Sequence, residues 1–207
     1  MRGRLIVFEG IDGVGKTTLS RLVASALGAV WMTTPDVDDR VVRERVDRAW
    51  YEPEARQLYY AGSVVHASGT IRRHLEAGRD VVVDRYWLTT VAYSEIGGST
   101  LDLAVVEHAL VAADATVFVQ LPESERLARL SRRGVSANDA LSLRRSRELV
   151  AAYRRLGAHP LAGKTFAVEG SAEPAVVAAL VVRQLAFIRP GGEAEQLPLF
   201  ERLGTVR

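Results

Sequence analysis

The chain has 207 residues, of which 48% are hydrophobic and 25% charged, and its formal net charge is +2 at neutral pH. This composition is ordinary for one globular core and argues against a disordered or fibrous chain. The sequence contains no cysteine, which excludes a disulfide scaffold, a zinc–cysteine site and thiol catalysis. We find no secretory segment and no apolar run of membrane-spanning length, so we expect a cytoplasmic protein that contacts no membrane.

A glycine-rich loop lies between a predicted strand at 5–8 and a predicted helix that begins at Lys16. Glycines let the backbone N–H groups of such a loop point inward, where a side chain would block a phosphate. The helix adds the positive end of its dipole. The loop matches G-x-x-x-x-G-K-[ST] at every fixed position, with Thr18 following it: Gly10, Ile11, Asp12, Gly13, Val14, Gly15, Lys16, Thr17.

These residue types indicate a binding site for ATP and Mg²⁺. Lys16 supplies a mobile cation for the outer phosphates, and the Thr17 hydroxyl is placed to ligate the metal. A glycine-rich turn that merely connects a strand to a helix is the alternative. The strand before the loop and the helix after it favour the nucleotide site.

Strands and helices alternate along the rest of the chain, which predicts a parallel sheet with right-handed crossovers. Predicted strands lie at 29–32, 80–84, 115–121 and 164–168. Predicted helices lie at 37–48, 54–77, 88–93, 101–111, 122–134, 139–157 and 173–188. In the first of these helices Val41, Val42 and Val46 share one side. We expect a kinase domain over 1–188 and a flexible tail over 189–207.

The third predicted strand is apolar and ends in Asp84, followed by Arg85 and Tyr86. In a phosphate-loop protein, an acid at this place is typical of a second carboxylate on the Mg²⁺ side. The alternative is that Asp84 caps the next helix.

Two arginine-bearing helices joined by a short link predict a lid over about 122–147 that closes on a triphosphate. Arg126, Arg129 and Arg133 share one face of the first of these helices, because they are three and seven residues apart.

The phosphate loop preceded by Phe8-Glu9, the triplet Asp84-Arg85-Tyr86, the Ala92-Tyr93 pair and the helix ending in arginines together resemble thymidylate kinase. The resemblance covers roughly residues 4–188. It implies a three-layer α/β/α phosphate-loop fold with five parallel strands in the order 2-3-1-4-5, a helical lid and a homodimer. It also implies transfer of the ATP γ-phosphate to the phosphate of dTMP.

The resemblance assigns roles to particular residues. Lys16 and Thr17 hold ATP and Mg²⁺, Asp12 lies between the two nucleotides, and Arg85 grips the acceptor phosphate. Catalytic arginines come from the lid, where Arg129 and Arg133 are the candidates. The nucleoside monophosphate acceptor contacts a further set, in which Tyr59 stacks on the base and Tyr93 packs under the sugar: Pro35, Tyr59, Ser63, Arg85, Thr90, Tyr93.

Three departures from the family pattern leave the nucleobase open. Ser63 stands where the family has an arginine that reaches the base edge. The segment Thr34-Pro35-Asp36-Val37 replaces Glu-Pro-Gly-Gly, and 138–141 replaces Asp-Arg-Phe-Glu after the lid. A base edge without its partner costs about 1 to 3 kcal/mol, enough to change which base is accepted.

Two other functions stay open. A deoxynucleoside kinase would phosphorylate a 5′-hydroxyl and needs a carboxylate base, for which Asp36 is the candidate. A nucleotide-binding replication module would dock through Gln196–Phe200, which resembles the pentapeptide that binds the bacterial sliding clamp. A tail that folds back on its own domain is the alternative to docking. No direct nucleic-acid binding is expected.

Overall fold

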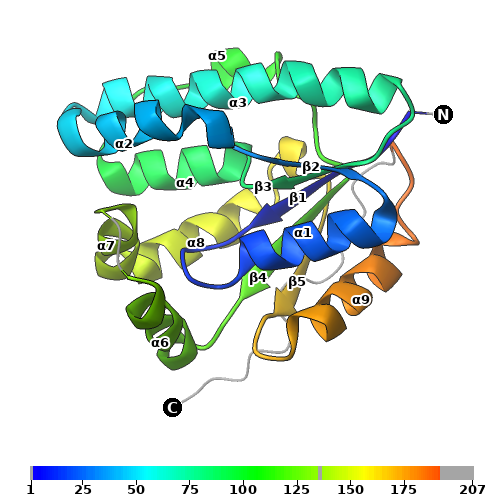
Figure 1. The fold of residues 1–207 in the computed structure, drawn as a ribbon. Coiled ribbons are helices and arrows are strands. Elements are labelled where there is room, and N and C mark those ends of the chain that lie inside the picture. The colour runs from blue at the N-terminus through cyan, green and yellow to red at the C-terminus, as the bar shows by residue number, and fades with distance from the viewer. Residues whose placement is uncertain (1, 135–136, 192–207) are drawn as a thin grey trace.

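A central sheet lies between two layers of helices in the computed structural model of the chain, which describes residues 2–134 and 137–191 (Figure 1). All strand pairs are parallel, and the order is β2-β3-β1-β4-β5. The strands are β1 (Leu5–Glu9), β2 (Val30–Thr33), β3 (Val81–Asp84), β4 (Ala115–Gln120) and β5 (Lys164–Glu169). The strand–helix alternation expected from the sequence and the sheet order implied by the family resemblance are both confirmed.

Both faces of the sheet are buried, which explains why the strands read as continuous apolar runs. Leu5 and Val7 of β1 belong to a core cluster with residues of α3 (Pro53–Glu76), whereas Ile6 and Phe8 belong to a cluster with α1 (Lys16–Leu27). Helices α1 and α9 (Pro174–Leu185) lie side by side on one face. Helices α3, α4 (Trp87–Gly97) and α8 (Ser146–Leu156) cover the other.

The remaining helices are short. They are η1 (Val37–Asp39), α2 (Arg40–Ala49), α5 (Ala104–Glu107), α6 (Glu123–Arg133), α7 (Ala137–Arg144) and η2 (Pro160–Ala162). The predicted helix at 139–157 is broken at Arg145, because α8 turns to bury Leu149 and Tyr153 against α4 and the sheet while α7 contacts α2. The predicted helix at 101–111 is reduced to the single turn α5.

The valines of α2 do not form one buried side. Val46 is buried, but Val41 and Val42 are exposed, because only one narrow face of this charged helix meets the rest of the protein.

The tail segment Gln196–Phe200 lies outside the described residues, so its proposed docking role stays a prediction. Within 2–134 and 137–191, none of the helices combines the length and the apolarity that crossing a bilayer requires.

The carboxyl ends of β1 and β3 meet at one edge of the sheet, with Phe8 paired to Asp84. In open α/β sheets, ligands bind at this edge. The phosphate loop follows β1 here and Arg85 follows β3, so the sheet itself brings the two predicted halves of the site together.

Candidate active site

The phosphate loop at residues 10–17 turns from β1 into α1 with its apolar side chains directed into the core. Ile11 and Val14 are buried in the main core cluster, which leaves their backbone groups to line the loop. Gly13 has φ +87°, and a Cβ there would lie 2.8 Å from Cγ of Leu130, so this position requires glycine. No acidic residue occupies the first turn of α1, so its dipole is available to an anion.

Lys16 is buried at the start of α1, and its Nζ donates a 2.7 Å hydrogen bond to the carbonyl of Ile11. Burial and the neighbouring Arg85 charge lower the pKa of Lys16 to about 8, against the opposite effect of Asp12 and Asp84. Lys16 therefore remains mostly charged near neutral pH, and an incoming phosphate would stabilise that charge.

Thr17 and Asp84 meet as a pair at the mouth of the loop. The Thr17 hydroxyl donates a 2.5 Å hydrogen bond to Oδ2 of Asp84, and the other carboxylate oxygen, Oδ1, is buried with no hydrogen-bond partner among the described residues. A buried carboxylate oxygen without a partner fits a cation ligand. The described residues contain no cluster of three or more His, Cys, Asp or Glu able to hold a metal. A magnesium ion here would therefore rely on phosphate and water oxygens, as Mg²⁺ usually does.

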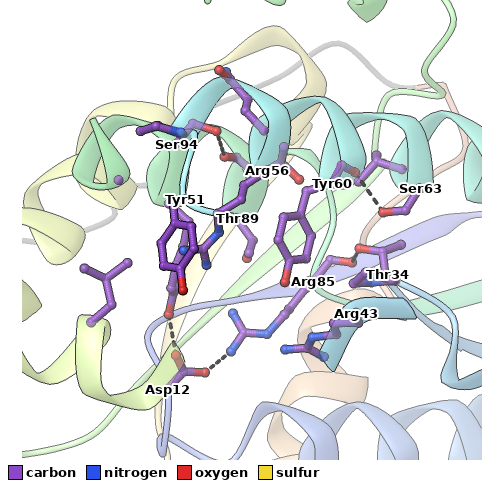
Figure 2. A pocket seen from close by; sticks show the side chains of 18 residues that line it. Asp12, Thr34, Arg43, Tyr51, Arg56, Tyr60, Ser63, Arg85, Thr89 and Ser94 are labelled. Carbon is purple, nitrogen blue, oxygen red and sulfur yellow. Dashed lines mark hydrogen bonds and ion pairs between the residues drawn. The ribbon is translucent and has the colours of Figure 1, made fainter. Parts of the chain in front are cut away.

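A cavity of about 120 Å³ opens beside the loop, between α3 and α4 (Figure 2). Five of the six residues predicted to contact the acceptor line it, together with Asp12 and twelve others. The lining residues are Asp12, Thr34, Pro35, Arg43, Tyr51, Pro53, Arg56, Gln57, Tyr60, Ser63, Val64, Arg85, Thr89, Thr90, Tyr93, Ser94, Gly97 and Leu141.

Asp12 of the loop joins the loop to this cavity. Its carboxylate forms an ion pair with Arg85 and accepts a 2.5 Å hydrogen bond from the Tyr93 hydroxyl (Figure 2). Burial opposes ionisation of Asp12, but the charges of Arg85 and Lys16 and the Tyr93 hydrogen bond outweigh it and lower the pKa to about 2. Burial raises the pKa of Tyr93, so this phenol stays protonated as a donor.

The backbone of Arg85 is held in an unusual conformation, with φ +69°. Its N–H donates to the carbonyl of Phe8 at 3.0 Å, and its own carbonyl accepts from the Thr34 hydroxyl at 2.8 Å. Positive φ in a non-glycine residue persists only where the surroundings fix it. The β1 and β2 ends therefore aim the Arg85 side chain at the phosphate loop.

Glu9, at the end of β1, is fully buried behind Arg85. It accepts hydrogen bonds from the backbone N–H groups of Tyr86 and Thr89 and from the Thr89 hydroxyl, and so caps α4 from the neighbouring strand. Burial raises the pKa of Glu9 against these hydrogen bonds and the Arg85 charge. Glu9 thus ties the start of α4, and with it Thr90 and Tyr93, to the strand that carries the phosphate loop.

The arginine face of α6 lies against the phosphate loop, as the spacing predicts. Arg126 is fully buried and donates to the carbonyl of Asp12 at 3.2 Å. Arg129 donates to the carbonyl of Gly170 at 2.8 Å, and one of its Nη atoms lies 3.3 Å from where a Cβ of Gly15 would be. Arg133 contributes to the lowered pKa of Asp12.

Two predicted site residues lie elsewhere. Tyr59 does not line the cavity; its neighbour Tyr60 does, because the face of α3 that meets the cavity runs through Arg56, Tyr60 and Ser63. Asp36 is exposed, and its Oδ1 accepts from the N–H of Asp38 to cap η1. The candidate base of the nucleoside kinase alternative therefore does not line the cavity.

Sequence reasoning missed Arg43 and Arg56 in the cavity wall. Arg43 lies on α2 and Arg56 on α3, and both approach Asp47, at 3.7 Å and 3.5 Å. The i,i+4 spacing of Arg43 and Asp47 can be read from the sequence. Because α2 carries four arginines, this spacing alone does not predict which of them lines the cavity.

These features define a phosphate-loop kinase. The phosphate loop follows the first strand of a 2-3-1-4-5 sheet, Asp84 lies beside Thr17 of that loop, and the cavity between α3 and α4 opens next to it. The family model for thymidylate kinase matches residues 8–173. A thymidylate kinase of Rhizorhabdus wittichii is 30% identical over 210 positions, which cover 92% of this chain and 100% of that protein. The chain therefore belongs to the thymidylate kinase family and is an ATP-dependent phosphotransferase.

Two solved structures have the same fold. Thymidylate kinase from Candida albicans superposes with a TM-score of 0.71 at 18% identity, over 89% of this chain and 92% of its own. Deoxyadenosine kinase from M. mycoides superposes with a TM-score of 0.66 at 16% identity, over 89% and 100%. At these identities the likeness concerns the fold alone.

Proposed function

We propose that the protein transfers the γ-phosphate of ATP to the 5′-phosphate of dTMP or a closely related deoxynucleotide, with Mg²⁺. The observation that carries this proposal is the pairing of Asp12, a phosphate-loop residue, with Arg85 in the cavity wall. It brings an arginine suited to an acceptor phosphate directly beside the loop suited to the donor.

The donor half rests on the loop at residues 10–17. Its inward N–H groups and the Lys16 ammonium bind the β- and γ-phosphates, and the exposed start of α1 at Thr17 and Thr18 adds further donors. Thr17 and the unpartnered oxygen of Asp84 fit Mg²⁺. The ion would supply charge neutralisation to the phosphate chain.

The acceptor half rests on an exchange at Arg85. Its guanidinium pairs through Nη2 with one carboxylate oxygen of Asp12, and the planar fork of an arginine can bind an acceptor phosphate in a bidentate manner. Tyr93 lines the same cavity, and we expect its ring to pack under the sugar of the acceptor. Because an acceptor phosphate is already ionised near neutral pH, the reaction needs position and cations rather than a general base.

The arginines of α6 complete the charge around the transferred group. Arg129 and Arg133 face the phosphate loop, and an arginine in such a place is worth about 10³ to 10⁵ in rate. Arg126 is engaged with the Asp12 carbonyl and so supports the loop instead.

Phosphorylation of a nucleoside 5′-hydroxyl is the second candidate, and Asp12 is the single carboxylate among the described residues that line the cavity. Asp36 is exposed outside the cavity, and Asp12, with a pKa of about 2 and an arginine partner, is a poor proton acceptor near neutral pH. An acceptor that already carries an ionised phosphate needs no carboxylate base.

A coupled ADP-release assay across dTMP, dUMP, dCMP, dGMP, UMP and thymidine tests the proposal. We expect turnover with dTMP and none with thymidine, and loss of turnover in Lys16→Ala. Activity with thymidine but not dTMP would establish the nucleoside kinase instead. Undiminished turnover in Lys16→Ala would refute the donor site.

A further inference from the structure

One tyrosine lies in the apolar stripe of α8. The buried residues of this helix are Leu149, Ala152, Tyr153 and Leu156, at the spacing that turns one helix face toward a core. The Tyr153 ring belongs to the main core cluster, with its centroid 6.1 Å from that of Phe118 on β4. A phenylalanine would serve this packing equally well, so the buried hydroxyl of Tyr153 needs a separate explanation.

The Tyr153 hydroxyl reaches α4, where its oxygen lies 2.8 Å from Oγ1 of Thr89. The direction of this hydrogen bond follows from the next contact. Thr89 has a single hydroxyl proton, and it donates that proton to Oε2 of Glu9. Tyr153 therefore donates to Thr89. Burial raises the pKa of the Tyr153 phenol, which keeps the donated proton in place.

Glu9 forms the other end of this chain of hydrogen bonds. Its carboxylate is fully buried at the end of β1 and also accepts from the backbone N–H groups of Tyr86 and Thr89, at 3.1 Å and 3.2 Å. Both N–H groups belong to the segment that directly follows Arg85. A displacement of Thr89 would therefore loosen the backbone from which the Arg85 side chain extends.

The acceptor cavity has wall residues on both helices that this chain joins. Thr89 and Arg85 line it (Figure 2), and so does Leu141 of α7, the helix that leads into α8. Leu141 is tied to the start of α8, because its carbonyl accepts a 3.0 Å hydrogen bond from the N–H of Arg145. The hydrogen bond from Tyr153 to Thr89 thus connects the α7–α8 side of the cavity with the side that carries Arg85.

An exposed ion pair also joins α8 to α4. It links Arg155 to Glu95, whose side chains are 61% and 43% exposed. Such pairs contribute little, because solvent screens the two charges. Neither residue lines the acceptor cavity, so this ion pair offers a matched control for the buried hydrogen bond between the same two helices.

We propose that Tyr153 is a positioning residue for phosphoryl transfer, and that its hydroxyl, acting through Thr89 and Glu9, holds Arg85 in place for the acceptor phosphate. The inference rests on the proposed function and adds a residue of α8 that touches neither nucleotide. Because the hydroxyl acts on the binding of the acceptor, its loss affects the monophosphate and spares ATP.

The first test measures KM for both substrates in Tyr153→Phe, with the monophosphate that the native protein phosphorylates fastest. We expect KM for the monophosphate to rise about threefold to tenfold, the effect of one lost hydrogen bond. KM for ATP should stay within about twofold of the native value, since the loop at residues 10–17 keeps its contacts. The control Glu95→Gln removes the exposed ion pair and should leave both KM values unchanged.

Variants of Thr89 test the same hydrogen bond from α4. Thr89→Val keeps the shape of the side chain but leaves the Tyr153 hydroxyl and Oε2 of Glu9 without this partner. KM for the monophosphate should then rise about tenfold or more, whereas Thr89→Ser keeps the hydroxyl and should stay near the native value. Tyr153→Phe combined with Thr89→Val should resemble Thr89→Val alone, because both changes break one chain of hydrogen bonds.

The outcomes separate this inference from the function on which it rests. A native protein that phosphorylates no nucleoside monophosphate refutes the proposed function. With an active native protein, the positioning role alone is overturned if Tyr153→Phe keeps the native KM for the monophosphate or raises KM for ATP equally. Effects of Tyr153→Phe and Thr89→Val that simply add overturn the coupling between the two hydroxyls. If Tyr153→Phe fails to fold, as judged by its thermal unfolding, Thr89→Val and Thr89→Ser decide, and equal KM values in these two variants overturn the proposal.

Discussion

Replacing Asp12 with asparagine isolates the charge that joins the phosphate loop to the acceptor cavity. The substitution keeps the shape of the side chain and its capacity to accept from Tyr93, but removes the ion pair with Arg85. The pKa of Asp12 falls from an ordinary 3.8 to about 2 in the folded protein. Since one pKa unit corresponds to about 1.4 kcal/mol, the ionised carboxylate stabilises the fold by about 2 kcal/mol.

The sign of the pH dependence follows from the direction of that shift. A carboxyl whose pKa is lower in the folded state contributes its stability above the unfolded value and loses it as pH falls through the folded value. Native protein and Asp12→Asn should therefore differ by about 2 kcal/mol near pH 7. The difference should shrink between about pH 4 and pH 2.

Urea denaturation at a series of pH values, followed by tryptophan fluorescence, measures this difference. Asp36→Asn, which removes an exposed aspartate outside the cavity, is the matched control and should stay close to the native protein throughout. An Asp12→Asn difference that keeps its size from pH 7 down to about pH 2.5 would refute the assigned ion pair.

Three further predictions follow from the loop, the core and the tail. ATP affinity should fall as pH rises through about 8, because Lys16 then loses its proton before ATP binds. Calorimetric titration with ATP in two buffers measures this affinity, and a constant value from about pH 7 to 9 would contradict the prediction. Gly163→Ala should lower the free energy of unfolding by more than about 2 kcal/mol, because Gly163 has φ +62° and a Cβ there would lie 2.1 Å from the carbonyl oxygen of Ala113. The control Gly62→Ala, on α3 with open space around it, should leave the protein equally stable or more stable. Urea denaturation measures both. Removal of residues 192–207 should leave turnover intact and abolish any binding to a sliding clamp in a pull-down. If the full-length protein binds no clamp in the same pull-down, the clamp is not a partner.

The sequence was sufficient for the parallel sheet and for the place of the phosphate loop between β1 and α1. A G-x-x-x-x-G-K-[ST] string is local, so its eight residues carry their own geometry, and the strand–helix alternation specifies the parallel sheet. Which side chains face the acceptor cavity depends on how α3 is rotated about its axis. The packing of α3 against the hydrophobic core sets that rotation. Neighbouring helical positions lie about 100° apart, so the packing of Ala61 and Val64 determines that Tyr60 rather than Tyr59 faces the cavity.

The arginines of α2 could not be assigned for a related reason. Residues 40, 43, 45 and 48 are all arginine, and of these Arg43 lines the cavity. The position of α2 beside α3 depends on tertiary contacts such as the Tyr60–Asp47 hydrogen bond, which links residues 13 positions apart on two different helices. No local pattern encodes it.

The buried first two turns of α6 limit any movement of the predicted lid at about 122–147. Arg126 and Leu130 are both almost fully buried, one bonded to the Asp12 carbonyl and the other packed against Gly13. Displacing this part of the helix would break those contacts and leave a guanidinium without its carbonyl partner, so the first two turns of α6 belong to the static frame of the donor site. If the predicted lid at about 122–147 closes on a nucleotide, these contacts would place its pivot beyond Leu130, with Arg133 on the moving side and Arg129 next to the axis.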